Sequence, residues 1–153
     1  MKKIDLNLSL KSIGIKPNDI FIIHIDAGAI AQFKYKKSIE NLKKFSKKLI
    51  NYIGKEGTII VPTFSYSFIQ NKIYNLKKTP SEVGQFSENF RKKKNIKRSE
   101  HPIFSVAVYG KFSKVFLSKN LNDCFGENTI FDELKKTNAN IVCFGWRLVR
   151  ITF

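Results

Sequence analysis

Short apolar runs separated by amphipathic segments are the feature that most constrains the fold of this chain. Ile20–Ile25 (IFIIHI) and Gly57–Thr63 (GTIIVPT) are rich in β-branched residues and show no polar alternation, which is typical of strands buried on both faces. Ser38–Ile53 instead repeats apolar residues every three or four positions opposite a face of lysines, which predicts an amphipathic helix. Strands and helices alternating in this way predict a three-layer α/β/α fold with a mainly parallel central sheet.

Weaker patterns fill in the rest of this expected architecture. Two more strands are expected at Phe104–Tyr109 and Ile141–Gly145, helices at Leu6–Ile13, Ser87–Lys94, Phe112–Leu117 and Ile130–Lys136, and a turn at Lys77–Ser81. No internal repeat, linker or low-complexity tract interrupts them, so residues 1–153 are interpreted as a single α/β domain.

Ligands of such sheets bind outside the carboxyl ends of the strands. Here these ends carry His24-Ile25-Asp26-Ala27-Gly28, Thr63-Phe64-Ser65 and Gly145-Trp146-Arg147. The segments combine polar, small and glycine residues, as a ligand site requires.

Composition excludes several classes of protein. The chain is 42% hydrophobic and contains 14 phenylalanines, which excludes a disordered chain. No apolar run approaches the roughly 20 residues of a membrane span, and Asp5 interrupts the region where a signal peptide is apolar. A cytoplasmic protein with no membrane partner is therefore expected. Cys124 and Cys143 are too few for a disulfide framework or a closed four-ligand zinc site; they are interpreted as buried apolar residues, and no metal is expected.

The net charge of +16 raises the possibility of nucleic-acid binding. However, 24 of the 28 basic residues are lysines, spread along the chain, whereas arginine is the residue that reads bases and grips phosphates in a fork. A nucleic-acid-binding protein is therefore the less favoured alternative. The charge favours an anionic cofactor or substrate.

Familiar catalytic motifs are missing from the sequence. It contains no GxGxxG, P-loop, HExxH or GxSxG pattern. The most unusual stretch is RSEHPIFSVA, in which Arg98 and Ser99 are candidates for phosphate binding and His101 for titration near neutrality. From the residues alone, a structural loop whose polar side chains hydrogen-bond to the local backbone is as well supported as a functional site.

Two residues at the end of the first strand are also ambiguous. His24 is more often a structural histidine in such a position. Asp26 either caps a following helix or orients His24.

Several segments carry a resemblance to one known family. KPNDIFIIHIDAG resembles an opening in which a strand ends in His-Ser-Ser, and GTIIVPTFSYSF resembles the pattern G-T-L-x-x-P-T-F. RSEHPIFSVAVYG resembles R-S-x-H-P-x-x-S-V-A-x-x-G, and TPSEVG, CFGENTIFDEL and IVCFGWRLVRITF resemble the remaining segments in order. These are the patterns of the aminoglycoside 3-N-acetyltransferases, or antibiotic N-acetyltransferases, and the resemblance covers essentially the whole chain.

The resemblance implies transfer of an acetyl group from acetyl-CoA to a primary amine of an amino sugar, either an aminoglycoside or a nucleotide-linked amino sugar. It implies an α/β/α fold and no metal. The positions it assigns to the acetyl-CoA site are His24, Asp26, Ala27, Thr63, Phe64, Arg98, Ser99, His101, Ser105 and Val106. It does not indicate the oligomeric state.

Two departures from the family pattern affect the expected activity. The His-Ser-Ser opening is here His24-Ile25-Asp26, which places a carboxylate near the expected phosphates. The histidine and glutamate that the family uses to deprotonate the amine would lie beyond Phe153, so the catalytic residues are unknown. The sequence is therefore expected to be a truncated acetyltransferase with impaired catalysis, or alternatively an inactive CoA-binding remnant.

Overall fold

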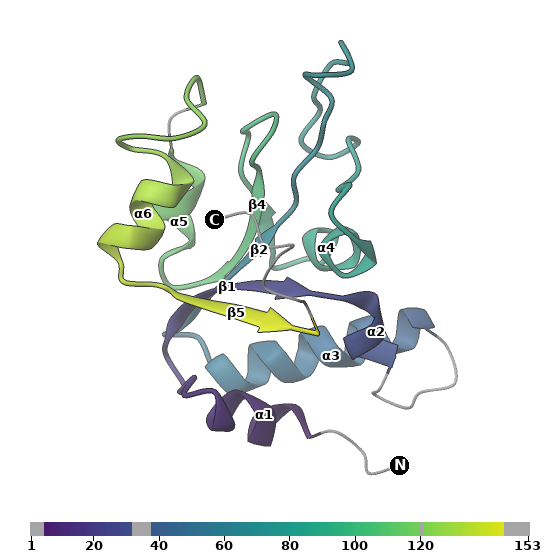
Figure 1. Ribbon diagram of the computed structural model, residues 1–153, viewed down its shortest axis with the longest axis vertical. Coiled ribbons are helices and arrows are strands. Elements are labelled where there is room, and N and C mark those ends of the chain that lie inside the picture. Colours follow the sequence, from purple (N-terminus) through teal and green to yellow (C-terminus); the bar gives the residue numbers. More distant parts are fainter. Residues whose placement is uncertain (1–4, 32–37, 120, 146–153) are drawn as a thin grey trace.

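The computed structural model describes residues 5–31, 38–119 and 121–145, and a five-stranded sheet forms the centre of this part of the chain (Figure 1). The strands are β1 (Ile20–Ile25), β2 (Thr58–Pro62), β3 (Lys97–Arg98), β4 (Val106–Gly110) and β5 (Asn140–Phe144). Their order across the sheet is β3-β4-β2-β1-β5.

The sheet is mixed, and β4 is the strand that makes it so. β1 is parallel to both of its neighbours, β2 and β5, whereas β4 is antiparallel to both β2 and β3. All the strands except β4 therefore run in one direction, which agrees with the expected mainly parallel sheet. The exception has a simple cause, because residues 99–105 between β3 and β4 are too few for the crossover that a parallel pair needs.

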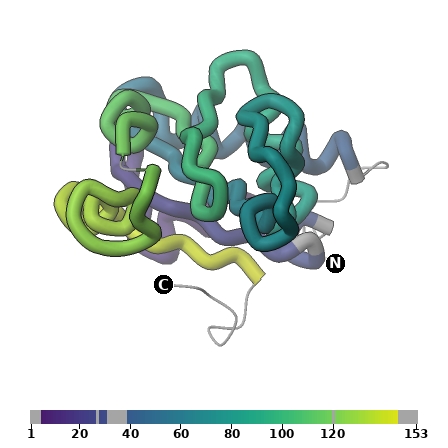
Figure 2. Tube along the Cα trace, turned by 90° about the horizontal axis from the view of Figure 1, so that it is seen from above, coloured from purple at the N-terminus to yellow at the C-terminus, as the bar shows by residue number. Residues whose placement is uncertain are grey.

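Helices cover both faces of the sheet. They are α1 (Leu6–Ser12), α2 (Ala27–Ala31), α3 (Ser38–Ile53), α4 (Gln85–Arg91), α5 (Ser113–Leu117) and α6 (Ile130–Lys136). Alternate β1 residues, Phe21 and Ile23, face one core with α1, α3 and α4, whereas Ile22 faces a second core with α5 and α6. The three-layer arrangement is thus confirmed, and the view in Figure 2 shows β1 and β5 side by side within it.

Most element boundaries lie within two residues of those expected from the sequence. The helices Ser38–Ile53 and Ile130–Lys136 have the expected ends. The α4 helix begins at Gln85, two residues earlier than predicted, and ends at Arg91, three residues earlier. The short strand β3 was not predicted, because Lys97 and Arg98 carry no apolar signal. None of the helices in the described part of the chain is long and apolar enough to cross a bilayer.

The cysteines correct one expectation. Cys124 and Cys143 are free thiols and are only partly buried, because Cys143 lies on the edge strand β5 and Cys124 lies in the loop before α6.

Candidate functional site

The topology brings the predicted segments to one end of the sheet. β1, β2 and β3 end there, and the antiparallel strand β4 begins there. Thr63, which follows β2, donates its N–H to the carbonyl of Ser105 at 2.8 Å, and Ser65 donates to Ile103 at 3.1 Å. The segment after β2 is therefore joined to the loop of residues 99–105, which we call the 99–105 loop.

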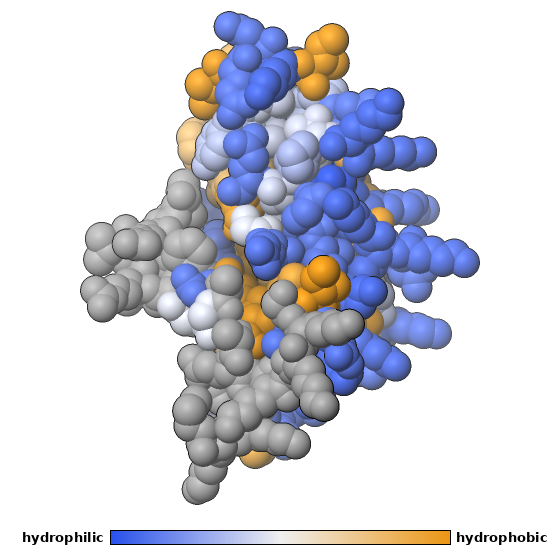
Figure 3. All heavy atoms as spheres, turned by 90° about the vertical axis from the view of Figure 1, so that its right-hand side faces the viewer, coloured by the Kyte–Doolittle hydropathy of each residue, from blue (hydrophilic) through white to orange (hydrophobic). Residues whose placement is uncertain are grey.

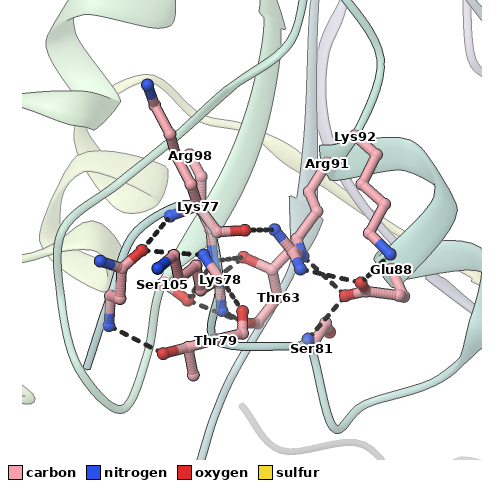
Figure 4. Close-up of polar contacts among 11 residues, drawn as sticks. Thr63, Lys77, Lys78, Thr79, Ser81, Glu88, Arg91, Lys92, Arg98 and Ser105 are labelled. Atoms are coloured by element: carbon pink, nitrogen blue, oxygen red, sulfur yellow. Dashed lines mark hydrogen bonds and ion pairs between the residues drawn. The ribbon is translucent and has the colours of Figure 1, made fainter. Parts of the chain in front are cut away.

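Arg98 connects three segments at this end of the sheet (Figure 4). Its Nη2 donates to the Thr63 carbonyl and its Nη1 to the Thr79 carbonyl, both at 2.6 Å. Its Nε donates to Ser105 Oγ at 3.1 Å and to Thr63 Oγ1 at 3.2 Å, and the guanidinium carbon lies 5.1 Å from the centre of the Tyr74 ring. Only 7% of the residue is exposed, and its guanidinium joins these segments through hydrogen bonds to their backbone and hydroxyl groups. Phosphate binding by Arg98 stays a prediction.

A second arginine fixes residues 77–81, where the sequence predicted a turn; the structure has the turn at residues 76–78, followed by a bend at Thr79. Arg91 makes a two-point ion pair with Glu88, at 2.6 and 2.8 Å, and also donates to the Lys77 carbonyl. Glu88 accepts the Ser81 backbone N–H at 2.8 Å. Sequence reasoning assigned no role to Arg91 or Glu88, although their spacing of three residues within a predicted helix is a recognisable ion-pair signal.

Opposing effects set the ionisation of Glu88. Burial alone would raise the pKa of this carboxyl, but hydrogen bonds from Arg91, Lys92 and the Ser81 N–H lower it to about 2. Glu88 is therefore ionised at neutral pH and ties Arg91 to the backbone at Ser81 (Figure 4).

Both ring nitrogens of His101 contact backbone groups, those of its own loop and the carbonyl of Asp123. Its Nδ1 accepts the N–H groups of Ile103 and Phe104, at 3.1 and 2.9 Å, and its Nε2 lies 3.2 Å from the Asp123 carbonyl. This pattern assigns the hydrogen to Nε2 and leaves Nδ1 unprotonated. Burial lowers the pKa of His101, with a smaller opposing effect from the Asp123 carbonyl. His101 is thus neutral at pH 7 and structural.

A pH dependence of stability follows from this arrangement. Below the unfolded pKa of about 6.5, unfolded His101 takes up a proton that the folded side chain does not. The free energy of unfolding should therefore fall as the pH drops from 6.5 towards the lower folded pKa. Urea unfolding between pH 7.5 and 5.5 measures this slope, to which each histidine contributes at most about 1.4 kcal/mol per pH unit.

His101→Asn supplies the matched variant for this prediction. The asparagine oxygen can still accept the loop N–H groups but does not titrate, so the slope should shrink. His24→Asn serves as the comparison, since burial also lowers the pKa of His24. An unchanged slope in His101→Asn would contradict the assignment.

The other loop residues also satisfy local groups. Ser99 Oγ accepts the Val106 N–H at 2.9 Å, and the two backbones are joined by a further bond of 2.9 Å from Ser99 N to the Val106 carbonyl. Ser105 Oγ donates to the Thr63 carbonyl at 2.8 Å. Phe64 is buried, with its ring edge-to-face against Phe104. The alternative of a self-satisfied loop therefore describes these side chains well.

His24 and Asp26 lie at the end of β1, on the far side of β2 from the 99–105 loop. Asp26 Oδ1 accepts the Gly28 N–H at 2.6 Å, so the capping interpretation of Asp26 is confirmed, and Ala27 begins α2. His24 is half-buried and borders a cavity of about 280 Å³ with Phe131 and Ile141. Trp146 and Arg147, expected near this end, lie outside the described residues.

The structure thus brings Thr63, Arg98 and Ser105 into direct contact, with Ser99, His101 and Val106 in the same loop structure. Comparison with known proteins adds the family. A sequence model of the aminoglycoside 3-N-acetyltransferases matches residues 22–153.

The chain belongs to the aminoglycoside 3-N-acetyltransferase family.

Relatives within and around this family share the fold. The SPbeta prophage-derived aminoglycoside N(3')-acetyltransferase-like protein YokD of Bacillus subtilis (strain 168) is 24% identical over 167 residues, which cover 89% of this chain and 57% of YokD. The crystal structure of aminoglycoside acetyltransferase AAC(3)-IVa with apramycin matches with a TM-score of 0.77 and 18% identity, over 95% of this chain and 57% of that one. AAC-IIIb with CoASH matches with a TM-score of 0.78 and 15% identity, over 95% and 60%. The chain therefore spans somewhat more than half the length of the proteins it matches.

Proposed function

We propose that the chain functions as an acetyl-CoA-dependent N-acetyltransferase that modifies a primary amine of an amino sugar in the cytoplasm. The observation that carries the proposal is the family match over residues 22–153, which includes both the segment after β2 and the 99–105 loop. The similarity to AAC-IIIb, whose structure contains CoASH, supports CoA as the cosubstrate. Either an aminoglycoside or a nucleotide-linked amino sugar fits this acceptor chemistry, and the net charge of +16 favours an anionic acceptor.

The proposed reaction is a direct acyl transfer. The amine nitrogen attacks the thioester carbonyl, a C–N bond forms, the C–S bond breaks, and the CoA thiolate leaves. The nitrogen must lose a proton to a base, because an ammonium ion has no lone pair. Thr63, Arg98 and Ser105 are buried, so we assign them the role of positioning residues that fix the loops around the cosubstrate.

The proposal predicts a CoA-binding chain whose affinity depends on this cluster. Ser105→Ala removes the hydroxyl that donates to the Thr63 carbonyl and accepts from Arg98, and it should weaken CoA binding by about 1–2 kcal/mol, since one buried hydrogen-bonding group is lost. Isothermal titration calorimetry with CoA measures the change. Ser118→Ala is the control, because Ser118 is an exposed residue that bonds only within its own turn. Absence of CoA binding by the unaltered chain would reject the proposal, and equal affinities for the two variants would reject the positioning role.

A second candidate is a protein that binds CoA without transferring its acetyl group. It is favoured by the environments of the two histidines, because His101 is committed to its own loop and burial lowers the pKa of His24. Titration with CoA alongside an assay of acetyl transfer distinguishes the two candidates. Binding without transfer would favour the second.

A further inference from the structure

A basic groove lies along the β3 edge of the sheet, away from the residues of the proposed acetyl-CoA site other than Arg98. Three hollows of about 470, 460 and 540 Å³ meet there, and each pair of them shares a residue among positions 95–97. Helices α3 and α4 border one side, and β4 and α5 border the other. We call this the β3-edge groove and define it by Lys43, Lys47, Lys93, Lys94, Lys97 and Lys114.

The charge of the β3-edge groove is poorly compensated. Among the described residues that line the three hollows, Glu100 is the only acidic one. Two lysines that line the hollows are neutralised, because Lys92 pairs with Glu88 and Lys111 pairs with Glu56. In the described part of the chain, none of the six defining lysines forms an ion pair with a carboxylate. Burial and the charge of Lys43 both lower the pKa of Lys93. A bound anion would therefore reduce the electrostatic repulsion among these lysines.

The spatial arrangement also corrects the impression given by the sequence, in which the lysines are spread along the chain. Lysines from α3, the end of α4, β3 and α5 gather at one edge. Figure 3 shows long hydrophilic side chains projecting from one side of the molecule.

The lining residues indicate which kind of anion fits. Lysines contact phosphates as point charges, whereas base reading relies on arginine forks and single-strand binding on exposed aromatic rings. Tyr109 is the aromatic residue that lines the groove, and it is half-buried. The four most exposed large apolar side chains of the described residues do not line it; they are Leu8, Phe68, Ile69 and Ile73. The groove therefore lacks the insertion residues typical of a membrane-binding face.

We propose that the β3-edge groove binds the sugar–phosphate backbone of a nucleic-acid duplex without sequence specificity. This activity is separate from acetyl transfer and does not depend on the proposed function.

Two charge-matched triple variants test the proposal. Lys47→Glu/Lys93→Glu/Lys97→Glu changes the groove, and Lys11→Glu/Lys16→Glu/Lys48→Glu changes exposed lysines elsewhere, including the neighbour of Lys47 on α3. Both lower the net charge equally. Fluorescence anisotropy with labelled DNA and RNA duplexes of about 20 base pairs, between about 50 and 200 mM salt, gives the affinity and its salt dependence.

The groove variant should bind at least tenfold more weakly at about 50 mM salt. The negative slope of log K against log salt should become shallower by about 2.7, because three phosphate contacts are lost. The control should stay within threefold of the unaltered chain. Equal losses in the two variants, or no duplex binding by the unaltered chain, would overturn the proposal. Binding to phosphatidylserine vesicles in place of both duplexes would also overturn it. Thermal unfolding checks the fold, and the corresponding lysine-to-glutamine triples replace either variant that does not fold.

Discussion

Replacing Arg98 with alanine is expected to lower the free energy of unfolding by about 3–6 kcal/mol. The substitution removes two short charge-assisted hydrogen bonds, to the carbonyls of Thr63 and Thr79, and each such bond contributes about 1.5–3 kcal/mol. The Thr63 carbonyl still accepts from Ser105 Oγ at 2.8 Å, whereas the Thr79 carbonyl loses the donor that Arg98 supplies. A loss of this size is a large part of the stability of an ordinary domain.

Urea unfolding of Arg98→Ala measures this loss, and two further variants identify its cause. Arg98→Lys keeps the charge but not the planar fork, so it should recover only part of the stability. Lys92→Ala removes an exposed charge that pairs with Glu88 and should cost less than about 1 kcal/mol. If Arg98→Lys were as stable as the unaltered chain, the positive charge alone would account for the effect. A loss below about 1 kcal/mol in Arg98→Ala would contradict the proposed structural role of Arg98.

Acetyl transfer by the 153-residue chain is expected to be about 10²–10⁴-fold slower than catalysis by a family member that has a general base. Among the described residues, His101 uses Nδ1 for N–H groups of its own loop and Nε2 for the Asp123 carbonyl. His24 borders a largely apolar cavity, and burial lowers its pKa, which makes it a weaker base.

Release of free CoA thiol measures the transfer, with acetyl-CoA and an amino-sugar acceptor supplied together. Added imidazole should accelerate the reaction, because it supplies a base from solution, while a buffer of the same pH without a nitrogen base should not. His24→Asn should leave the slow rate unchanged. Turnover typical of the family that His24→Asn abolishes would contradict the prediction and assign the base to His24.

The layered fold was largely predictable because burial on two faces leaves a strong mark on sequence. The runs at Ile20–Ile25 and Gly57–Thr63 lack alternating polar residues because neither face of these strands is open to solvent. Whether a strand runs parallel or antiparallel to its neighbours was not predictable in this way, since a buried apolar run has the same pattern in both orientations. Only the short connection before β4 carried that information, and recognising it required knowing that Lys97 and Arg98 form a strand.

The sequence indicated that the polar residues of the candidate site lie together but did not give their geometry, and their part in a CoA site stays a prediction. The spacing of Arg98, Ser99, His101 and Ser105 indicated a common structure, and the structure brings them together. The sequence did not show that Arg98 points at protein carbonyls, because hydrogen-bond partners such as Thr79 come from a turn nineteen residues away. Nor did it show the gathering of lysines along β3, since distances across a sheet depend on strand order.

The position of β5 beside β1 has a consequence for how the chain is made. Phe21 pairs with Asn140, so the central strand β1 must keep one edge open while about 120 further residues leave the ribosome. Its other edge can pair with β2 much earlier, because Phe21 also pairs with Ile59. Closing such a distant pair is slow, and an open strand edge invites association with other chains in the meantime. The yield of folded protein should therefore depend on the rate of synthesis and on chaperones that shield the waiting edge of β1.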